Sequence, residues 1–360
     1  PLPDILRSYG YRTIHVGKAH FGAIGTPGAN PLNLGFEVNI GGHAARSPGS
    51  YLGVHNYSGK WKGNEAVWDV PGLEAYHGSN TFLTEALTLE ASKAVEVAVR
   101  DKKPFFLYMA HYAVHIPLER DERFYAKYLA MGLDDKEACY AALIEGMDKS
   151  LGDIMDKLLK LGVLDNTVIV FMSDNGGLSA EGRGGKPNMH NLPLKSGKGS
   201  AYEGGIRVPM MVHLPKGKAA TSKTPVIIED LFPTILELAG VPKDIKLPQK
   251  VDGLSLVKAV AGAKLPERPL VWHYPNIWGP SGPGIQPFSA IREGQWKLIY
   301  FHNDGHKELY QISEDEAESK LRNDRKEIVE KLSRDLRTIL VERGAKLPFD
   351  RKLNRAVSLP

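Results

Sequence analysis

Apolar residues recur along the chain with two alternating spacings, one typical of helices and one typical of buried strands. Residues 82–100 carry apolar positions at helical spacing, and a short apolar run at 105–110 follows Pro104. The same order returns where an apolar stripe over 143–161 precedes the run 167–172. A helix followed by a buried strand is typical of a parallel sheet with crossover helices. The pattern therefore predicts an α/β fold.

Two more segments continue this pattern. Residues 207–215 predict a strand, and residues 227–240 predict a helix that ends on Gly240. Crossover helices cover both faces of a parallel sheet. We therefore predict one large, mainly parallel sheet sandwiched by helices over residues 1–262. Residues 23–80 are rich in Gly, Pro and Asn without sustained periodicity, which predicts long surface loops around a site.

The pattern changes after about residue 262. Residues 289–301 predict a hairpin that turns at Glu293 and Gly294, and residues 306–312 predict a further strand. Apolar positions from Ile328 to Leu340 lie on one face of a helix. We therefore predict a smaller C-terminal antiparallel sheet with a terminal helix over residues 263–360.

Composition narrows the class of protein without naming its chemistry. The 360 residues are 42% hydrophobic and 24% charged, as in ordinary globular proteins, and no stretch is apolar enough to span a bilayer. The net charge of +4 is small and dispersed, so it favours neither nucleic acid nor a membrane as partner. The one cysteine, Cys139, lies in a helical pattern and is expected to be a buried thiol. The start, PLPDILRSYGYRT, has no initiator Met or signal-peptide pattern, and we expect it to be an interior point of a longer protein.

Asp174 and Asn175 follow the apolar run 168–172 after one residue, Ser173, and precede two glycines. These residue types commonly form a plain turn. They also offer oxygen ligands to a hard cation, and ligands gather at the carboxyl ends of strands in open α/β sheets. Both interpretations stay open on this segment alone.

Further cationic and imidazole side chains follow other predicted strands: Lys18 and His20, His111 and His115, and Lys198. Each has an ordinary alternative, because an isolated lysine is commonly a solvated surface residue and a lone histidine is commonly structural. Their convergence beyond strand ends, together with the Asp–Asn pair, favours a cradle for a tetrahedral anion.

The ordered motifs resemble those of type I sulfatases in the alkaline phosphatase superfamily. GYRTIHVGKAHFG resembles that family's Gly-Tyr-x-Thr-x-x-x-Gly-Lys-x-His signature, and HIP, SDNGG and GKGSAYEGGIRVP resemble its later motifs in order. The similarity runs from residue 1 to about 345 and includes DLFPTILELAGV, VDGLSL, AIREGQWKLI and ELYQI. The implied fold is alkaline phosphatase-like, and the implied activity is hydrolysis of sulfate esters through a formylglycine nucleophile.

The resemblance implies a role for each matched residue. Asp174 and Asn175 would bind one Ca²⁺. Lys18 would steady the formylglycine oxygens, and His20 would take the proton that drives elimination of the enzyme-bound sulfate. The other two matches, His115 and Lys198, would contact sulfate oxygens and assist the leaving alcohol, while His111 has no match and is expected at best to support the site or contact substrate.

The chain also departs from the family pattern. No Cys/Ser-x-Pro-x-Arg nucleophile motif is present, and only sixteen residues precede Gly17, where the family places this motif and two metal-binding aspartates. Cys139 lacks the proline and the arginine and cannot substitute. We therefore expect the printed chain to be inactive by itself, with the nucleophile in a missing N-terminal segment. A phosphatase or phosphonate hydrolase of the same superfamily, or a noncatalytic carbohydrate-binding remnant, stays an alternative.

The segment 272–284, WHYPNIWGPSGPG, resembles one found in bacterial sulfatases of carbohydrate sulfates. Its aromatic rings could stack on sugar faces, and His273 is a candidate substrate contact. The alternative is a packed loop between domains. The resemblance thus implies a sulfated saccharide as substrate and a periplasmic or secreted location, whereas the sequence does not specify the sugar or the oligomeric state.

Overall fold

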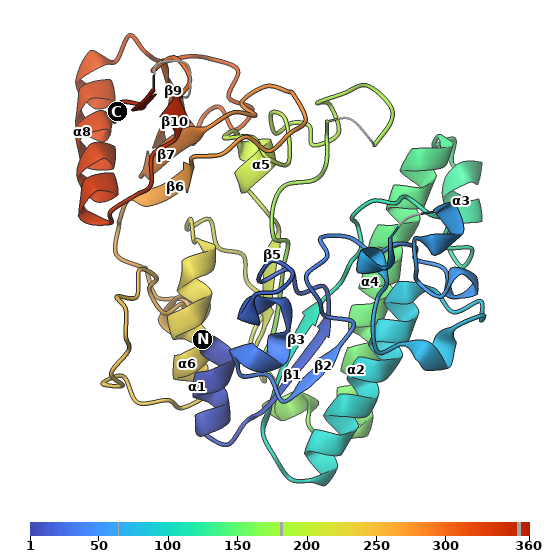
Figure 1. Ribbon diagram of the computed structural model, residues 1–360. Helices are drawn as coiled ribbons and strands as arrows, with labels where there is room; N and C mark the ends of the chain where they lie inside the picture. The colour runs from blue at the N-terminus through green and yellow to red at the C-terminus, as the bar shows by residue number, and fades with distance from the viewer. Residues whose placement is uncertain (64, 181–182, 351–353) are drawn as a thin grey trace. The chain divides into compact units, whose positions relative to one another are not determined.

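The computed structural model describes residues 1–63, 65–180, 183–350 and 354–360. The chain forms two compact units, drawn in Figure 1. The first comprises residues 1–168, 214–219 and 228–257, and the second comprises 169–213, 220–227 and 258–360. Residues 169–213 thus group with the C-terminal residues, whereas the sequence pattern placed a domain boundary at 262/263. That boundary stays a prediction.

The first unit is built on a three-stranded parallel sheet of order β2-β1-β3. Its strands are β1 (Arg12–Gly17), β2 (Val38–Ile40) and β3 (Phe105–Ala110). The pairing of Val16 with Ile40 and of Gly17 with Ala110 brings the three carboxyl ends to one edge. The sequence predicted β3, but it missed β2, which lies inside the segment expected to be loops.

Helices cover both faces of this sheet, as expected for crossover connections. Figure 1 shows α1 (Leu2–Ser8) and α6 (Leu231–Leu238) on one side, with α2 (Leu83–Arg100) and α4 (Asp135–Lys160) on the other. The apolar periodicity predicted α2, α4 and α6. Other short elements of this unit are α3 (Tyr125–Ala130), η7 (Leu164–Asn166) and η8 (Ile228–Asp230).

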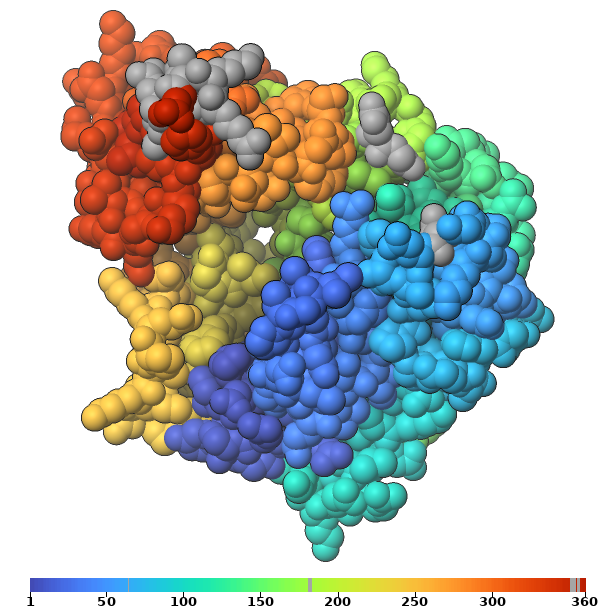
Figure 2. All heavy atoms as spheres, in the orientation of Figure 1, coloured from blue at the N-terminus to red at the C-terminus, as the bar shows by residue number. Residues whose placement is uncertain are grey.

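The segment 23–80 contributes to the core of the first unit as well as to its surface. The blue part of the chain forms a continuous surface over this unit in Figure 2. Tyr51, Tyr57 and Leu73 from the segment are nevertheless fully buried. The expectation of surface loops is therefore only half right. Short 3₁₀ turns order the segment: η1 (Pro27–Ala29), η2 (Pro31–Leu34), η3 (Gly53–His55), η4 (Lys60–Lys62), η5 (Ala66–Trp68) and η6 (Glu74–Tyr76).

The second unit begins with an antiparallel pair, β4 (Ile169–Met172) and β5 (Met210–His213). Both strands were predicted, but as part of a mainly parallel sheet, so their antiparallel direction was not. Between them lies a Gly-rich connection that ends in the short helix α5 (Glu203–Ile206). A change of direction is possible because this long connection returns the chain to the starting strand without a crossover helix.

A four-stranded antiparallel sheet of order β6-β7-β8-β9 completes the second unit. Residues buried on one face pack against Ala201 and Tyr202, and residues on the other pack against the terminal helix α8 (Lys326–Glu342). The predicted hairpin, strand and helix are confirmed. The strands are β6 (Leu270–Tyr274), β7 (Phe288–Glu293), β8 (Trp296–Phe301) and β9 (Lys307–Gln311), and the other short elements are α7 (Val257–Val260), β10 (Phe349–Asp350) and β11 (Arg355–Ala356).

Candidate functional site

Lys18 and His20 directly follow β1 at the carboxyl edge of the parallel sheet. The Lys18 amide donates to the Ala110 carbonyl at 2.7 Å, which ties this turn to the end of β3. Gly17 permits the close approach, since a Cβ there would lie 1.9 Å from the Ala110 oxygen. His20 is exposed and holds a φ of 54°, a left-handed conformation that non-glycine residues adopt rarely.

His111 and His115 follow β3 at the same edge. The Tyr51 hydroxyl donates to the His115 carbonyl at 2.9 Å, so a buried residue of the segment 23–80 fixes this turn. Nδ1 of His115 lies 3.0 Å from the Ile116 carbonyl. When Nδ1 carries the proton and donates to that carbonyl, Nε2 is the ring nitrogen with the lone pair.

His111 is half-buried as a residue, but burial of its ring lowers the pKa to about 4, so the ring is neutral near pH 7. Its Nδ1 has no hydrogen-bond partner among the residues that the structure describes. A buried nitrogen without a partner is unfavourable unless a ligand or water satisfies it. This geometry suits a residue that contacts a bound group, which is the most that the sequence allowed for His111.

His43 belongs to the same group of residues, although the sequence did not single it out. It follows β2, and its carbonyl accepts a hydrogen bond from the His20 amide at 3.0 Å. Burial lowers the pKa of His43, and its Nε2 has no partner within the described residues. A strand of three residues leaves little periodic signal, so only the pair of glycines before His43 marked this position in the sequence.

The second unit holds the other predicted group. Asp174 is exposed and Asn175 is half-buried in the turn after β4. The Gly176 amide donates to the Gly205 carbonyl at 3.0 Å, and a Cβ on Gly176 would lie only 1.8 Å from the Gly204 oxygen. The absence of side chains at Gly176 and Gly204 therefore allows two backbones to touch.

Lys198 lies beside this turn. Its amide donates to the Gly177 carbonyl at 3.0 Å, and Asn191 donates to the Gly177 and Ser196 carbonyls, both at 2.9 Å. The Lys198 ammonium lies 5.8 Å from the centre of the Trp278 ring, within the range of a cation–π interaction. The Lys198 segment and the Asp–Asn turn are thus held together by direct backbone contacts.

The Asp–Asn turn matches a calcium site in donor type but not in donor number. Asn175 uses its Nδ2 to donate to the Gly176 carbonyl at 3.0 Å, which leaves Oδ1 as an oxygen donor beside the Asp174 carboxylate. Ca²⁺ normally takes six to eight oxygens. Among the described residues, no group of three or more His, Cys, Asp or Glu side chains could hold a metal ion. The pair therefore supplies only part of such a site.

His273 lies in strand β6 rather than in a loop, because the apolar run LVWHY pairs with β7. Its Nδ1 lies 2.8 Å from the Ser289 hydroxyl, and its Nε2 lies 2.8 Å from the Lys346 carbonyl. Both ring nitrogens thus have partners inside the second unit. Strand β6 also corrects part of the expected loop 272–284, whose first three residues are strand.

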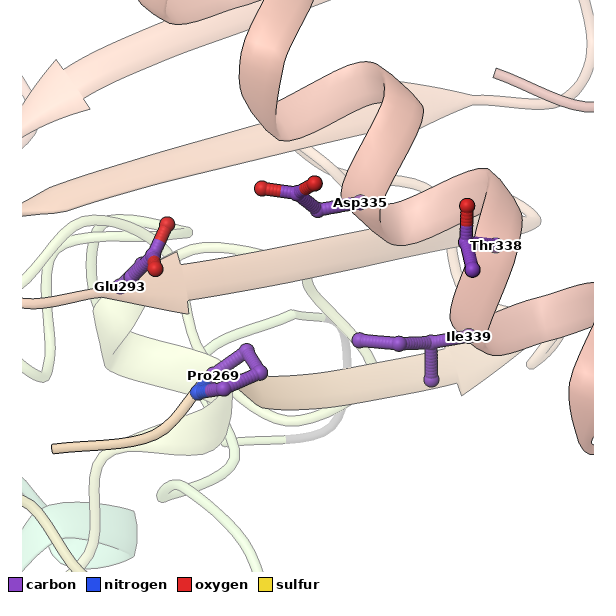
Figure 3. Close-up of a pocket in the computed structure, with 5 residues that line it drawn as sticks. All are labelled: Pro269, Glu293, Asp335, Thr338 and Ile339. Atoms are coloured by element: carbon purple, nitrogen blue, oxygen red, sulfur yellow. The ribbon is translucent and has the colours of Figure 1, made fainter. Parts of the chain in front are cut away.

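A shallow pocket of about 350 Å³ lies elsewhere in the second unit (Figure 3). It lies between α8 and the ends of β6 and β7, and its carboxylates, Glu293 and Asp335, are both paired with Lys331. None of the predicted site residues lines this pocket. The candidate chemistry therefore belongs to the strand ends and the Gly-rich turns.

Comparison with known proteins identifies the family. The Sulfatase family model matches residues 1–241, and a model described as N-sulphoglucosamine sulphohydrolase, C-terminal, matches residues 197–344. The chain belongs to the sulfatase family. The resemblance inferred from the ordered motifs is thereby confirmed, as is the mixed α/β class with a parallel sheet and a C-terminal antiparallel sheet.

Two curated relatives of this sulfatase family chain are themselves named as sulfatases. N-acetylgalactosamine-6-sulfatase of Mus musculus is 32% identical over 311 residues, covering 82% of this chain and 53% of that protein. Arylsulfatase J of Mus musculus is 29% identical over 324 residues, covering 83% of this chain and 50% of that protein. The chain thus spans about half the length of these curated relatives.

The fold is also shared with solved sulfatase structures. The crystal structure of Ps i-CgsB in complex with k-i-k-neocarrahexaose matches with a TM-score of 0.75 and 29% identity, covering 94% of this chain and 73% of that one. A putative sulfatase, yidJ from Bacteroides fragilis, matches with a TM-score of 0.69 at 20% identity and supports the fold alone. In the described part of this chain, no helix is long and apolar enough to cross a membrane.

Proposed function

We propose that this sulfatase family chain contributes active-site residues to a hydrolase of sulfate esters on saccharides. The observation that carries the proposal is the hydrogen bond from the Lys198 amide to the Gly177 carbonyl. It holds the backbone of the Lys198 segment beside the turn of Asp174 and Asn175, so that a cation and a sulfate group could be bound next to each other. The names of N-acetylgalactosamine-6-sulfatase and of the complex with k-i-k-neocarrahexaose support a sulfated sugar as substrate.

In the second unit, Lys198 supplies the positive charge for the reaction. Its ammonium would contact a sulfate oxygen and the bridging oxygen of the ester. Negative charge develops on this bridging oxygen as the alcohol leaves, and a fixed cation stabilises that charge. The Trp278 ring near the ammonium limits where the Lys198 side chain can lie. We leave His273 out of the proposed contacts, because both of its ring nitrogens already have partners.

In the first unit, the strand-end residues would handle the proton and the nucleophile. Lys18 would hold the oxygens of the nucleophile, and His20 would accept the proton that releases bound sulfate. His115 would contact sulfate through Nε2, the ring atom turned away from the Ile116 carbonyl. The neutral His111 ring would support the site or contact substrate.

The proposed chemistry also needs a metal ion and a nucleophile. Ca²⁺ would be bound in part by Asp174 and Asn175, and a formylglycine would supply the nucleophilic oxygen. No Cys/Ser-x-Pro-x-Arg motif occurs in the printed sequence. Cys139 cannot serve as the precursor, because it lies within α4 and is only 2% exposed. We further propose a periplasmic or secreted location, in keeping with the family resemblance.

The experiment compares the complete gene product with the printed chain, both made in a host that installs formylglycine. We expect the complete product to hydrolyse a chromogenic aryl sulfate and sulfated saccharides in a calcium-dependent manner, and the printed chain to hydrolyse neither. Replacing Lys198 or His115 by Ala should lower turnover on the order of a hundredfold or more, because each removes a charge or hydrogen bond made to the transition state.

Melting curves serve as the control, since these two substitutions should leave folding nearly unchanged. Turnover confined to phosphate or phosphonate esters would replace the proposal with the other activity of the superfamily. Binding of saccharides without turnover of any ester by the complete product would favour a noncatalytic role. Calcium-dependent sulfatase activity of the printed chain alone would contradict the assignment of the nucleophile.

A further inference from the structure

A buried ion cluster lies behind the Lys198 segment. The Lys297 ammonium, fully buried in β8, lies 2.8 Å from the Glu203 carboxylate and 2.8 Å from the Glu318 carboxylate. The Glu203 amide also donates to Glu318 at 2.6 Å. Burial raises the pKa of Glu318, and Arg292 lies 3.9 Å from the far oxygen of Glu203. None of these residues belongs to the proposed chemistry.

The cluster is connected to Lys198 through a short closed loop. The Gly204 amide donates to the Lys195 carbonyl at 3.0 Å, which joins the two ends of the segment 195–204. Lys198 lies within this loop, and its amide contacts Gly177 in the Asp–Asn turn. Because Glu203 is the residue before Gly204, the Lys297 ion pair holds the base of the loop against the C-terminal sheet.

A second layer of contacts reinforces the same base. The hydroxyls of Tyr202 and Tyr310 both donate to Glu308, at 2.7 and 2.8 Å. The Lys195 ammonium lies 3.7 Å from the centre of the Tyr202 ring and 3.4 Å from the Glu318 carbonyl. Both ends of the loop are therefore bonded to strands β8 and β9 or to the turn that follows them.

From this geometry we infer that Lys297 is a positioning residue, which sets the place of Lys198 through Glu203 and the closed loop. The inference rests on the proposed function of Lys198. Without the Lys297 ammonium, two carboxylates would remain buried side by side, and buried charges that lose their partner are strongly unfavourable. The loop base would move or admit water, and the Lys198 ammonium would lose its fixed position.

The test uses the complete gene product with Lys297→Met, which keeps the length of the side chain and removes the charge. Lys297→Arg keeps the charge and should restore part of the activity. Lys331→Met is a matched control, because Lys331 also bridges two carboxylates in this unit but is exposed and lies on α8. Each variant is also combined with Lys198→Ala, and kcat and KM are measured separately with an aryl sulfate.

We expect Lys297→Met to lower kcat about tenfold or more with little change in KM, because the charge that Lys198 stabilises develops on the bridging oxygen only in the transition state. In the Lys198→Ala background it should lower kcat by less than about twofold, since two residues that act through one contact are not additive. Lys331→Met should change kcat by less than about twofold in either background. An equal loss in both backgrounds would overturn the inference, because it would show a general effect on folding.

Hydrogen exchange separates this inference from the proposed function. In Lys297→Met, the amides of Lys198, Gly204 and Gly205 should exchange about tenfold faster or more, while amides in α8 keep their protection. If the unaltered protein shows no sulfatase activity, the proposed function fails, and exchange still decides whether Lys297 holds the loop. If Lys297→Met does not fold, Glu318→Gln is used, since it weakens the cluster and keeps an acceptor for the Glu203 amide. Unchanged exchange and unchanged kcat in a folded variant would contradict the positioning role.

Discussion

Gly176→Ala tests whether the two Gly-rich turns must touch. A Cβ at residue 176 would lie 1.8 Å from the Gly204 oxygen, whereas ordinary contact begins at 3.4 Å. The Gly204 backbone would have to retreat by about 1.6 Å, and neither partner is a flexible side chain. Overpacking of this kind typically costs about 1–3 kcal/mol, and loss of the hydrogen bond from Gly176 to Gly205 adds about 1 kcal/mol. We expect the second unit to lose about 2–4 kcal/mol of stability.

The assay is local hydrogen exchange together with thermal unfolding, because two compact units need not unfold in one transition. Amides of residues 173–177 and 197–205 should lose protection, and the melting temperature of the second unit should fall by several degrees. Gly152→Ala is the matched control, since no atom lies within 4 Å of its Cβ position in α4. That change should stabilise the helix by about 0.5–1 kcal/mol. A Gly176→Ala protein as stable as the unaltered one would refute the reasoning.

Two further predictions concern titratable groups. Burial lowers the pKa of His302 to about 4 from an ordinary 6.5. As the pH drops, the unfolded state therefore takes up the proton before the folded state does. The free energy of unfolding should fall between pH 6.5 and pH 4, by up to about 3 kcal/mol. His302→Gln should flatten this part of the pH–stability curve measured by thermal unfolding, and an unchanged slope would assign the effect elsewhere. Burial raises the pKa of the Cys139 thiol to about 11. The native protein should therefore react with a disulfide reagent at about pH 8 only as fast as it unfolds. Fast labelling of the folded protein would contradict the burial of Cys139.

The long periodic segments of the fold were predictable from sequence. Helix α2 begins within one residue of the expected 82–100 segment and ends at the same residue. The hairpin of β7 and β8 turns at Gly294, as the Glu–Gly pair indicated. In both cases the signal is local, because the residues that determine the element lie inside it. Local signals also located Lys18, His20 and Lys198, which follow strands or lie near Gly-rich turns.

The parts that sequence missed depend on distant residues. Strand β2 has three residues and forms only because β1 offers it a partner. The antiparallel direction of β4 and β5 is a property of pairing that neither strand carries alone. Glu203 and Lys297 are 94 residues apart, and each reads as an ordinary charged residue within its own segment. Their burial appears only when the C-terminal sheet packs against the Gly-rich loop.

The glycines of this loop explain why an ion cluster stands behind it. Gly197, Gly204 and Gly205 allow backbone contacts closer than any Cβ would permit, but they offer no side chains to fix the loop by packing. A segment that must hold Lys198 in one place therefore needs directional bonds from outside. The Lys297 ammonium provides such bonds, since two of its three donors are directed at Glu203 and Glu318, each 2.8 Å away. Apolar residues in their place could stabilise the unit equally well, yet they would tolerate small shifts of the loop that a charge cluster does not. On this argument the cluster contributes to the position of the loop more than to the stability of the fold.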